Sequence, residues 1–115
     1  MKRGDVYWAD LSPRSGAEQR GRRPVIVISH DAFNHTRGWR SIIIVPLSTS
    51  VAQARRGRSV VLLNVGTAGL NKESVALCHQ VTTLDRNKLT QRIGELDSFE
   101  MSQVENGLKA AMDLN

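Results

Sequence analysis

The sequence predicts a mainly β protein of the α+β class, in which a small, strongly bent antiparallel sheet or barrel carries one C-terminal helix. Two observations support this prediction. Short segments rich in valine and isoleucine alternate with turn residues, and only the last segment has strong helical periodicity. The chain has 115 residues, so residues 1–115 are expected to form one domain.

Three strands are expected in the first half of the chain. Residues 6–11 form the first strand, which a Ser-Pro pair ends, and residues 24–29 form the second. The apolar run that follows Pro24 indicates burial on both faces, and the proline suits the first position of a strand because no ladder donor is needed there. Residues 41–47 form the third strand.

The connections between these strands are polar. Residues 14–22 are expected to form a loop that contains arginine and glycine, and residues 30–38 a turn or short helical piece with cap residues. Residues 48–57 are expected to form a mobile basic loop.

The second half is expected to add shorter strands and the helix. Residues 58–65 read as a strand, and residues 74–80 and 92–96 as shorter ones. Residues 98–114 are the expected helix, with Asp97 or the serine after it as the cap. Five apolar residues fall at helical spacing and make one stripe along it: Met101, Val104, Leu108, Ala111 and Met112.

Charge is distributed unevenly along the chain. Residues 1–60 carry 11 Lys and Arg against 4 Asp and Glu, whereas residues 61–115 carry 5 against 7. Arginine outnumbers lysine 12 to 4, and arginine is favoured where planar, forked contact with phosphate matters. Either the surface is simply basic and soluble, or the first half binds an anionic partner, with nucleic acid the first candidate.

Cysteine usage and hydropathy limit the class of protein. Cys78 is the only cysteine, so an internal disulfide is impossible, and the three histidines lack zinc-site spacing. The apolar runs are too short to span a membrane, and no signal peptide is visible. A cytoplasmic protein without a metal or other cofactor is therefore expected.

Two arginines precede the most apolar strand. Pro24 biases Arg23 towards an extended backbone, which restrains the guanidinium before any ligand arrives. A restrained guanidinium at a groove edge can hold a phosphate by two hydrogen bonds. The alternative is that Arg22 and Arg23 only keep the end of the strand soluble.

Hydroxyl side chains follow the third strand directly, at Ser48, Thr49 and Ser50. Hydroxyls at a strand end can donate hydrogen bonds to phosphate oxygens. The same residues are also common in ordinary turns, so this reading stays open.

Titratable residues offer further candidates. Glu18 either accepts a proton or pairs with Arg20 or Arg22 on the same loop. His79 either lies in a groove or is an ordinary surface residue. Cys78 is expected to be a core thiol because no neighbour in the sequence would activate it.

Aromatic and basic residues elsewhere have two interpretations each. Trp39 lies among arginines, so it either stacks on a nucleic-acid base or packs locally against the sheet. Trp8 is expected in the core or at a subunit interface. Arg55, Arg56 and Arg58 either attract phosphate or belong to a solvated loop.

Four segments, read in order, resemble the MazF/PemK family, the toxins of bacterial toxin–antitoxin pairs. They are KRGDVYWADLSP at residues 2–13, GAEQRGRRPVIVIS at 16–29, IIIVPLSTS at 42–50 and SVALCHQVTTLD at 74–85. The resemblance covers nearly the whole chain, including the C-terminal helix.

This resemblance implies a fold of the plasmid-maintenance-toxin type, a small SH3-like barrel with a C-terminal helix. It implies a homodimer that cleaves single-stranded RNA at specific sequences without a metal ion. The ribose 2′-OH attacks the adjacent phosphorus and leaves a 2′,3′-cyclic phosphate and a 5′-OH. It also implies a cognate antitoxin whose acidic, partly disordered tail blocks the groove.

The resemblance also implies site residues. The essential arginine of the family corresponds to Arg23, its hydroxyl partner to Ser48 with Thr49 next to it, and its loop glutamate to Glu18. The catalytic candidates are therefore Arg23, Ser48 and Glu18. The RNA-binding candidates are Arg20, Arg22, Trp39, Thr49, Arg55, Arg56, Arg58 and His79.

The sequence departs from the PemK-like branch of the family at three positions. That branch has a histidine where Ala17 stands, an arginine where Leu77 stands and an aspartate where His79 stands. The MazF-like branch, in which arginine and a hydroxyl dominate, is the closer match. Two other functions stay open: a toxin of this fold that binds DNA gyrase without cutting, and an inactive regulator that only binds RNA or antitoxin.

Overall fold

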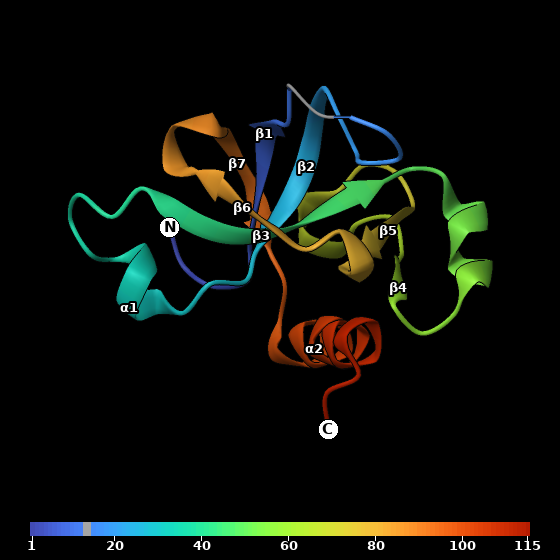
Figure 1. Cartoon of the computed structure of the whole chain (residues 1–115). Helices are drawn as coiled ribbons and strands as arrows, with labels where there is room; N and C mark the ends of the chain where they lie inside the picture. The colour runs from blue at the N-terminus through green and yellow to red at the C-terminus, as the bar shows by residue number, and fades with distance from the viewer. Residues whose placement is uncertain (13–14) are drawn as a thin grey trace.

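The computed structural model describes residues 1–12 and 15–115. Pro13, expected to end the first strand, and Arg14, expected to begin the following loop, lie outside the described residues. Within the described part, seven strands form an antiparallel sheet in the order β4-β5-β3-β2-β1-β7, and β6 pairs with β3 (Figure 1). With the C-terminal helix α2, this arrangement confirms the predicted mainly β fold.

The elements follow one another closely along the chain. The strands are β1 (Asp5–Asp10), β2 (Arg22–Val27), β3 (Ser41–Ser48), β4 (Val60–Leu63), β5 (Ser74–Leu77), β6 (Thr82–Asp85) and β7 (Leu89–Glu95). The α-helices are α1 (Asp31–Asn34) and α2 (Ser98–Met112). Among the residues that the structure describes, the short 3₁₀ helices are η1 (Val51–Arg56), η2 (Thr67–Gly69), η3 (Cys78–Gln80) and η4 (Arg86–Lys88).

The two central strands, β2 and β3, are buried on both faces, as the apolar run predicted. Ile26 and Val45 belong to one core cluster, together with residues of α2. Their neighbours Val25 and Ile44 belong to a second cluster on the opposite face. Alternation of side chains along a strand produces this division, because successive residues point to opposite faces.

The second strand begins earlier than predicted. The β1–β2 register runs from Val6 opposite Ile26 to Asp10 opposite Arg22, so the two arginines belong to the strand itself. Pro24 is the third residue of β2 and lies opposite Trp8, so the expectation that it begins the strand is wrong. Hairpin pairing with β1 has overridden the usual preference for proline at a strand start.

The other boundaries also shift. The strand β6 was not predicted because its sequence, TTLD, carries little apolar signal, and it forms by pairing with β3. The strand expected over 74–80 ends at Leu77, and η3 follows it. The expected strands 58–65 and 92–96 become Val60–Leu63 and Leu89–Glu95.

The C-terminal helix has a well-formed start. The Asp97 carboxylate accepts from the Glu100 N–H, and the Glu100 side chain accepts from the Asp97 N–H, which forms a capping box. Three residues of the predicted stripe are buried, whereas Met112 at its end is 47% exposed. The buried stripe consists of Met101, Val104 and Leu108.

Within residues 1–12 and 15–115, no helix has the length and apolar character needed to cross a membrane.

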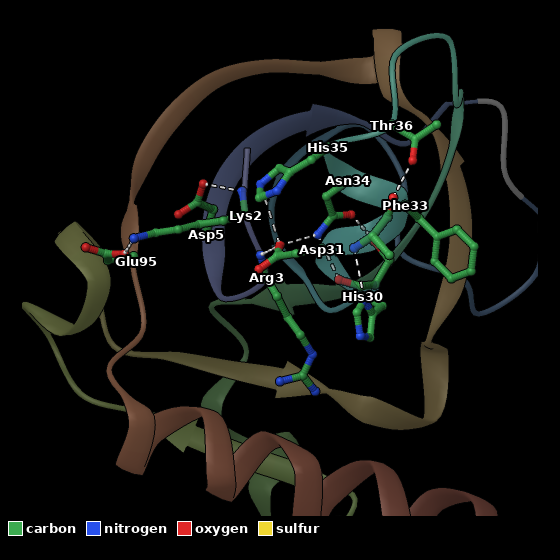
Figure 2. Close-up of polar contacts among 12 residues, drawn as sticks. Lys2, Arg3, Asp5, His30, Asp31, Phe33, Asn34, His35, Thr36 and Glu95 are labelled. Atoms are coloured by element: carbon green, nitrogen blue, oxygen red, sulfur yellow. Dashed lines mark hydrogen bonds and ion pairs between the residues drawn. The ribbon is translucent and has the colours of Figure 1, made fainter.

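Arg3 forms polar contacts with three other parts of the chain. Its backbone N–H donates to Asp31 Oδ1 at 2.7 Å, and its Nε donates to the Ile28 carbonyl at 3.0 Å. Its guanidinium also lies 2.8 Å from the Glu105 carboxylate of α2. Figure 2 shows Asp31 receiving the Arg3 backbone and the Asn34 side chain at once, which fixes α1 beside the N-terminus.

Candidate active site

The geometry of Arg23 is set by the hairpin of β1 and β2. Arg23 lies opposite Ala9 in the ladder and is partly buried. Its Nε donates to the Arg20 carbonyl at 3.1 Å, so the guanidinium is restrained from the loop side as well. Pro24 limits the backbone of its neighbour further. The predicted restraint of Arg23 is therefore present.

The β2–β3 ladder leads towards Arg23 and Ser48 but ends before it reaches them. Its last pair on this side is Val25 opposite Pro46, two residues short of Arg23 and of Ser48. Ser48 itself pairs with Val75 of β5 on the other side of β3.

The two hydroxyl candidates differ in their surroundings. Ser48 is only 7% exposed, and its Oγ accepts from the Ser50 N–H at 3.1 Å and from Gln53 Nε2 at 3.3 Å. Thr49 is exposed and lines a cavity with Arg23. The hydroxyl of Ser48 thus organises the turn into η1, whereas Thr49 is the exposed residue of the two and lines the cavity.

The cavity shared by Arg23 and Thr49 has a volume of about 390 Å³, and we call it the arginine cavity. Among its described lining residues are three cations and no carboxylate. The guanidinium of Arg22 lies over the Trp8 ring, 4.3 Å from its centroid. Such a cavity attracts anions and offers hydroxyl donors beside them. Its polar and aromatic lining residues are Trp8, Arg22, Arg23, Thr49, Asn71, Lys72 and Ser74.

A second cavity, of about 240 Å³, brings Glu18 and His79 together, and we call it the glutamate cavity. Pro46 of β3 also lines it, so it lies beside the strand that carries Ser48. Both titratable side chains are exposed, and Ser15 Oγ contacts Glu18 Oε1 at 3.4 Å. The proximity of residues so distant in the sequence arises from folding of the loop against η3.

A third hollow, of about 980 Å³, runs beside α2, and we call it the helix groove. Arg56, Arg58 and Lys109 line it, and His79 lies between this groove and the glutamate cavity. Arg55 lies on η1 and is exposed. The segment expected to be a mobile loop over 48–57 thus contains the 3₁₀ helix η1, which carries Arg55 and Arg56, and Arg58 follows it.

Other candidates have mainly structural surroundings. Trp39 stacks on Phe33 with ring centroids 4.9 Å apart, which favours the local-packing interpretation, although 42% of it remains exposed. Arg20 donates to the Gly16 carbonyl at 2.8 Å within its own loop. Cys78 is buried, which raises the pKa of its thiol to about 12 and confirms that it is a core thiol.

Sequence reasoning missed Trp8 and Lys72 as site residues. Trp8, expected in the core or at a subunit interface, is partly buried within this chain, and the Arg22 guanidinium lies over its ring. The nearly opposite places of Trp8 and Arg22 in the β1–β2 hairpin could have indicated this contact. Lys72 belongs to the turn before β5 and had no local signal. Among the described residues, no cluster of His, Cys, Asp and Glu is arranged to hold a metal ion.

Comparison with known proteins identifies the family. Residues 2–112 match the family described as the PemK-like, MazF-like toxin of type II toxin–antitoxin systems. Among curated relatives, Endoribonuclease EndoA of Bacillus subtilis is 38% identical over 114 residues, covering 99% of this chain and 96% of the relative. Endoribonuclease MazF2 of Mycobacterium bovis is 37% identical over 114 residues, covering 99% and 98%.

Solved structures share the fold. MazF from Deinococcus radiodurans superposes with a TM-score of 0.80 at 24% identity, covering 99% of this chain and 97% of that one. A mycobacterial endoribonuclease in complex with its cognate antitoxin superposes with a TM-score of 0.78 at 23% identity, covering 100% and 97%. This chain belongs to the PemK-like, MazF-like family of toxins.

Proposed function

We propose that this protein is a toxin that cleaves single-stranded RNA at specific sequences, without a metal ion, and that a cognate antitoxin neutralises it. The curated relatives are named endoribonucleases, and each alignment spans nearly all of both chains. The observation that carries the proposal is the arginine cavity, which Arg23 and Thr49 line together with further cations.

The substrate enters through electrostatic attraction. Arg22, Arg23 and Lys72 line the arginine cavity, and a phosphate backbone is drawn to such a concentration of positive charge. Arg56 and Arg58 extend the positive surface along the helix groove. The exposed loops around the cavities then select unstacked bases, which is how proteins usually read single-stranded RNA.

Cleavage is a transesterification. The ribose 2′-oxygen attacks the adjacent phosphorus, the bond from phosphorus to the 5′-oxygen breaks, and a 2′,3′-cyclic phosphate and a 5′-OH form. Negative charge develops on the phosphorane oxygens during this step. The Arg23 guanidinium stabilises that charge by two hydrogen bonds, since arginine holds its proton too firmly to act as an acid or base.

The two hydroxyl residues, Thr49 and Ser48, have different roles. Thr49 faces the arginine cavity and donates to a phosphate oxygen, while Ser48 supports the turn that presents it. A Thr49→Ala variant should therefore lose more activity than a Ser48→Ala variant of equal stability. The reverse order would make Ser48 the hydroxyl that contacts the phosphate.

Proton transfer belongs to the glutamate cavity. Glu18 accepts the proton of the 2′-OH, and His79, which lines the same cavity, returns a proton to the leaving 5′-oxygen. Glutamate and histidine are common partners in general acid–base catalysis, and histidine can exchange protons near neutral pH. A Glu18→Gln variant should slow cleavage by about a hundredfold or more if Glu18 is the base.

The same positive surface explains neutralisation. An acidic, partly disordered antitoxin tail can fold onto the arginine cavity and block it. Binding of such a tail should weaken as salt rises, though only in part because apolar contacts contribute too. The toxin acts as a homodimer in the cytoplasm, where RNA is available.

Incubation with a long single-stranded RNA in the presence of EDTA tests this function. We expect discrete cuts, with 5′-OH ends on one side and 2′,3′-cyclic phosphates on the other. Intact RNA together with inhibition of DNA gyrase supercoiling would instead support the gyrase-binding toxin. RNA that is bound but never cut would support the inactive regulator.

A further inference from the structure

We propose that Gln80 is a positioning residue that holds the loop of residues 15–21, and with it Glu18, against the glutamate cavity. The catalytic consequence rests on the proposed function, because it requires Glu18 to act in RNA cleavage. The structural part stands on its own. Gln80 is not among the residues that the sequence motifs single out for chemistry.

The side-chain amide of Gln80 uses both of its ends on the loop. The Gln19 N–H donates to Gln80 Oε1 at 2.8 Å, and Gln80 Nε2 donates to the Ala17 carbonyl at 3.2 Å. These two backbone groups belong to the residues on either side of Glu18. One side chain therefore fixes the peptide units that determine where the Glu18 carboxylate points.

The loop needs such an external anchor. Its residues are mostly exposed, and Gly16 and Gly21 have positive φ angles of 62° and 77°. The Leu11 N–H donates to the Gly21 carbonyl at 2.9 Å and holds that end of the loop to the β1–β2 hairpin. The bonds from Arg20 to the Gly16 carbonyl and from Arg23 to the Arg20 carbonyl join near neighbours, so none of these three bonds attaches the loop to an element outside the hairpin. Ordering an exposed polar loop costs substantial conformational entropy. A tether that already orders the loop reduces the entropy that is lost when RNA binds.

Gln80 itself is placed on a rigid base. It ends η3, whose first residue, Cys78, is fully buried and donates its backbone N–H to the Ser59 carbonyl at 3.0 Å. Cys78 also packs against α2 near Gly107. Gln80 therefore attaches the loop to an element that packs against the helix and the core.

Hydrogen exchange of the Gln19 amide tests the structural part without any RNA. In Gln80→Ala the acceptor is lost, so this amide should exchange at least tenfold faster, with global stability unchanged. In Gln80→Glu a carboxylate oxygen still accepts from Gln19, so its protection should persist while the bond to Ala17 is lost. Equal protection of Gln19 in the wild type and in Gln80→Ala would overturn the proposal.

Cleavage kinetics test the catalytic part. Gln80→Ala should lower kcat about tenfold with KM within about twofold, because the loop then spends less time in the competent position. Gln80→Glu should fall between this variant and the wild type. Asn64→Ala, at an exposed side-chain amide that lines none of the three cavities described above, is the matched control and should cleave normally.

A double-mutant cycle separates action through Glu18 from direct contact with RNA. If Gln80 acts through Glu18, then Gln80→Ala should cost little further activity in a Glu18→Gln background. Independent, fully additive losses would overturn the positioning role. A wild-type protein that cuts no RNA would refute the proposed function instead, and the exchange of the Gln19 amide would still test the tether.

Discussion

The guanidinium of Arg22 lies over the indole ring of Trp8, with 4.3 Å between its Cζ atom and the ring centroid. The two residues come from β1 and β2, and both line the arginine cavity. The ring therefore contacts an exposed cation at the place where we expect the RNA phosphates.

Replacement of Trp8 by leucine should weaken RNA binding by about two- to fivefold, which corresponds to a cation–π contact of about 0.5–1 kcal/mol at an exposed site. Fluorescence anisotropy with an oligonucleotide that lacks the attacking 2′-OH measures this affinity without cleavage. When Trp8→Leu is combined with Arg22→Gln, the loss of binding free energy should be smaller than the sum of the losses in the two single variants. Strictly additive losses would show that the ring does not act through Arg22.

Substitution of Gly107 by alanine should destabilise the protein, although alanine favours helices. A Cβ there would lie 2.7 Å from Cys78 Sγ and 2.8 Å from Val61 Cγ2. Overpacking of a core costs about 1–3 kcal/mol, and the better helix propensity returns about 1 kcal/mol. We expect a net loss of about 1 kcal/mol in the free energy of unfolding, measured by urea titration.

The control for this prediction lies one residue earlier on the same helix. Asn106→Ala replaces an exposed side chain, so it should stabilise the helix slightly by propensity alone. A Gly107→Ala variant that gains stability as much as Asn106→Ala would contradict the close packing of α2 on η3.

Acid should destabilise the fold through three carboxyl groups, of which Glu95 is exposed and Asp31 and Asp85 are partly buried. A hydrogen bond from Asn34 and the backbone of Arg3 lower the pKa of Asp31, the Asn87 N–H lowers that of Asp85, and Lys2 lowers that of Glu95. A carboxyl with a lowered pKa in the folded state stabilises the protein above its unfolded pKa, about 4, and this contribution is lost as the pH falls through the folded value.

Thermal unfolding between about pH 6 and pH 2 measures this effect. The Tm should fall as the pH drops below about 4, and an Asp31→Asn variant should show a shallower fall because one of the three groups no longer titrates. Glu73→Gln, which removes the same formal charge from an exposed residue, controls for net charge. An equally steep fall in the wild type and in Asp31→Asn would contradict a role for Asp31.

The sequence predicted the central sheet and the helix because these elements have strong local signals. The apolar run from Val25 marked a strand buried on both faces, and the spacing of Met101, Val104 and Leu108 marked the helix. The weaker elements needed tertiary pairing: β6 carries two threonines and becomes a strand only beside β3. Pro24 shows the same effect, since hairpin register placed it inside β2 against its local preference.

The site was predictable in part. The motif around Arg23 and the hydroxyls at the end of β3 came from the sequence, and the cavity shared by Arg23 and Thr49 required the fold. The sequence did not reveal the roles of Trp8, Lys72 and Gln80. Their contacts join segments that are distant along the chain or depend on the direction of a side chain. Hydrogen bonds such as that between Gln19 and Gln80 leave no periodic pattern to read.

The most direct test of the proposed function is the rate at which an Arg23→Ala variant cleaves single-stranded RNA, compared with the wild type under the same conditions. Circular dichroism and Tm should show that the variant folds, and Arg23→Lys should retain charge without the forked geometry. We predict that Arg23→Ala loses at least about a hundredfold in rate, with Arg23→Lys between it and the wild type. Undiminished cleavage by the folded Arg23→Ala variant would contradict the account.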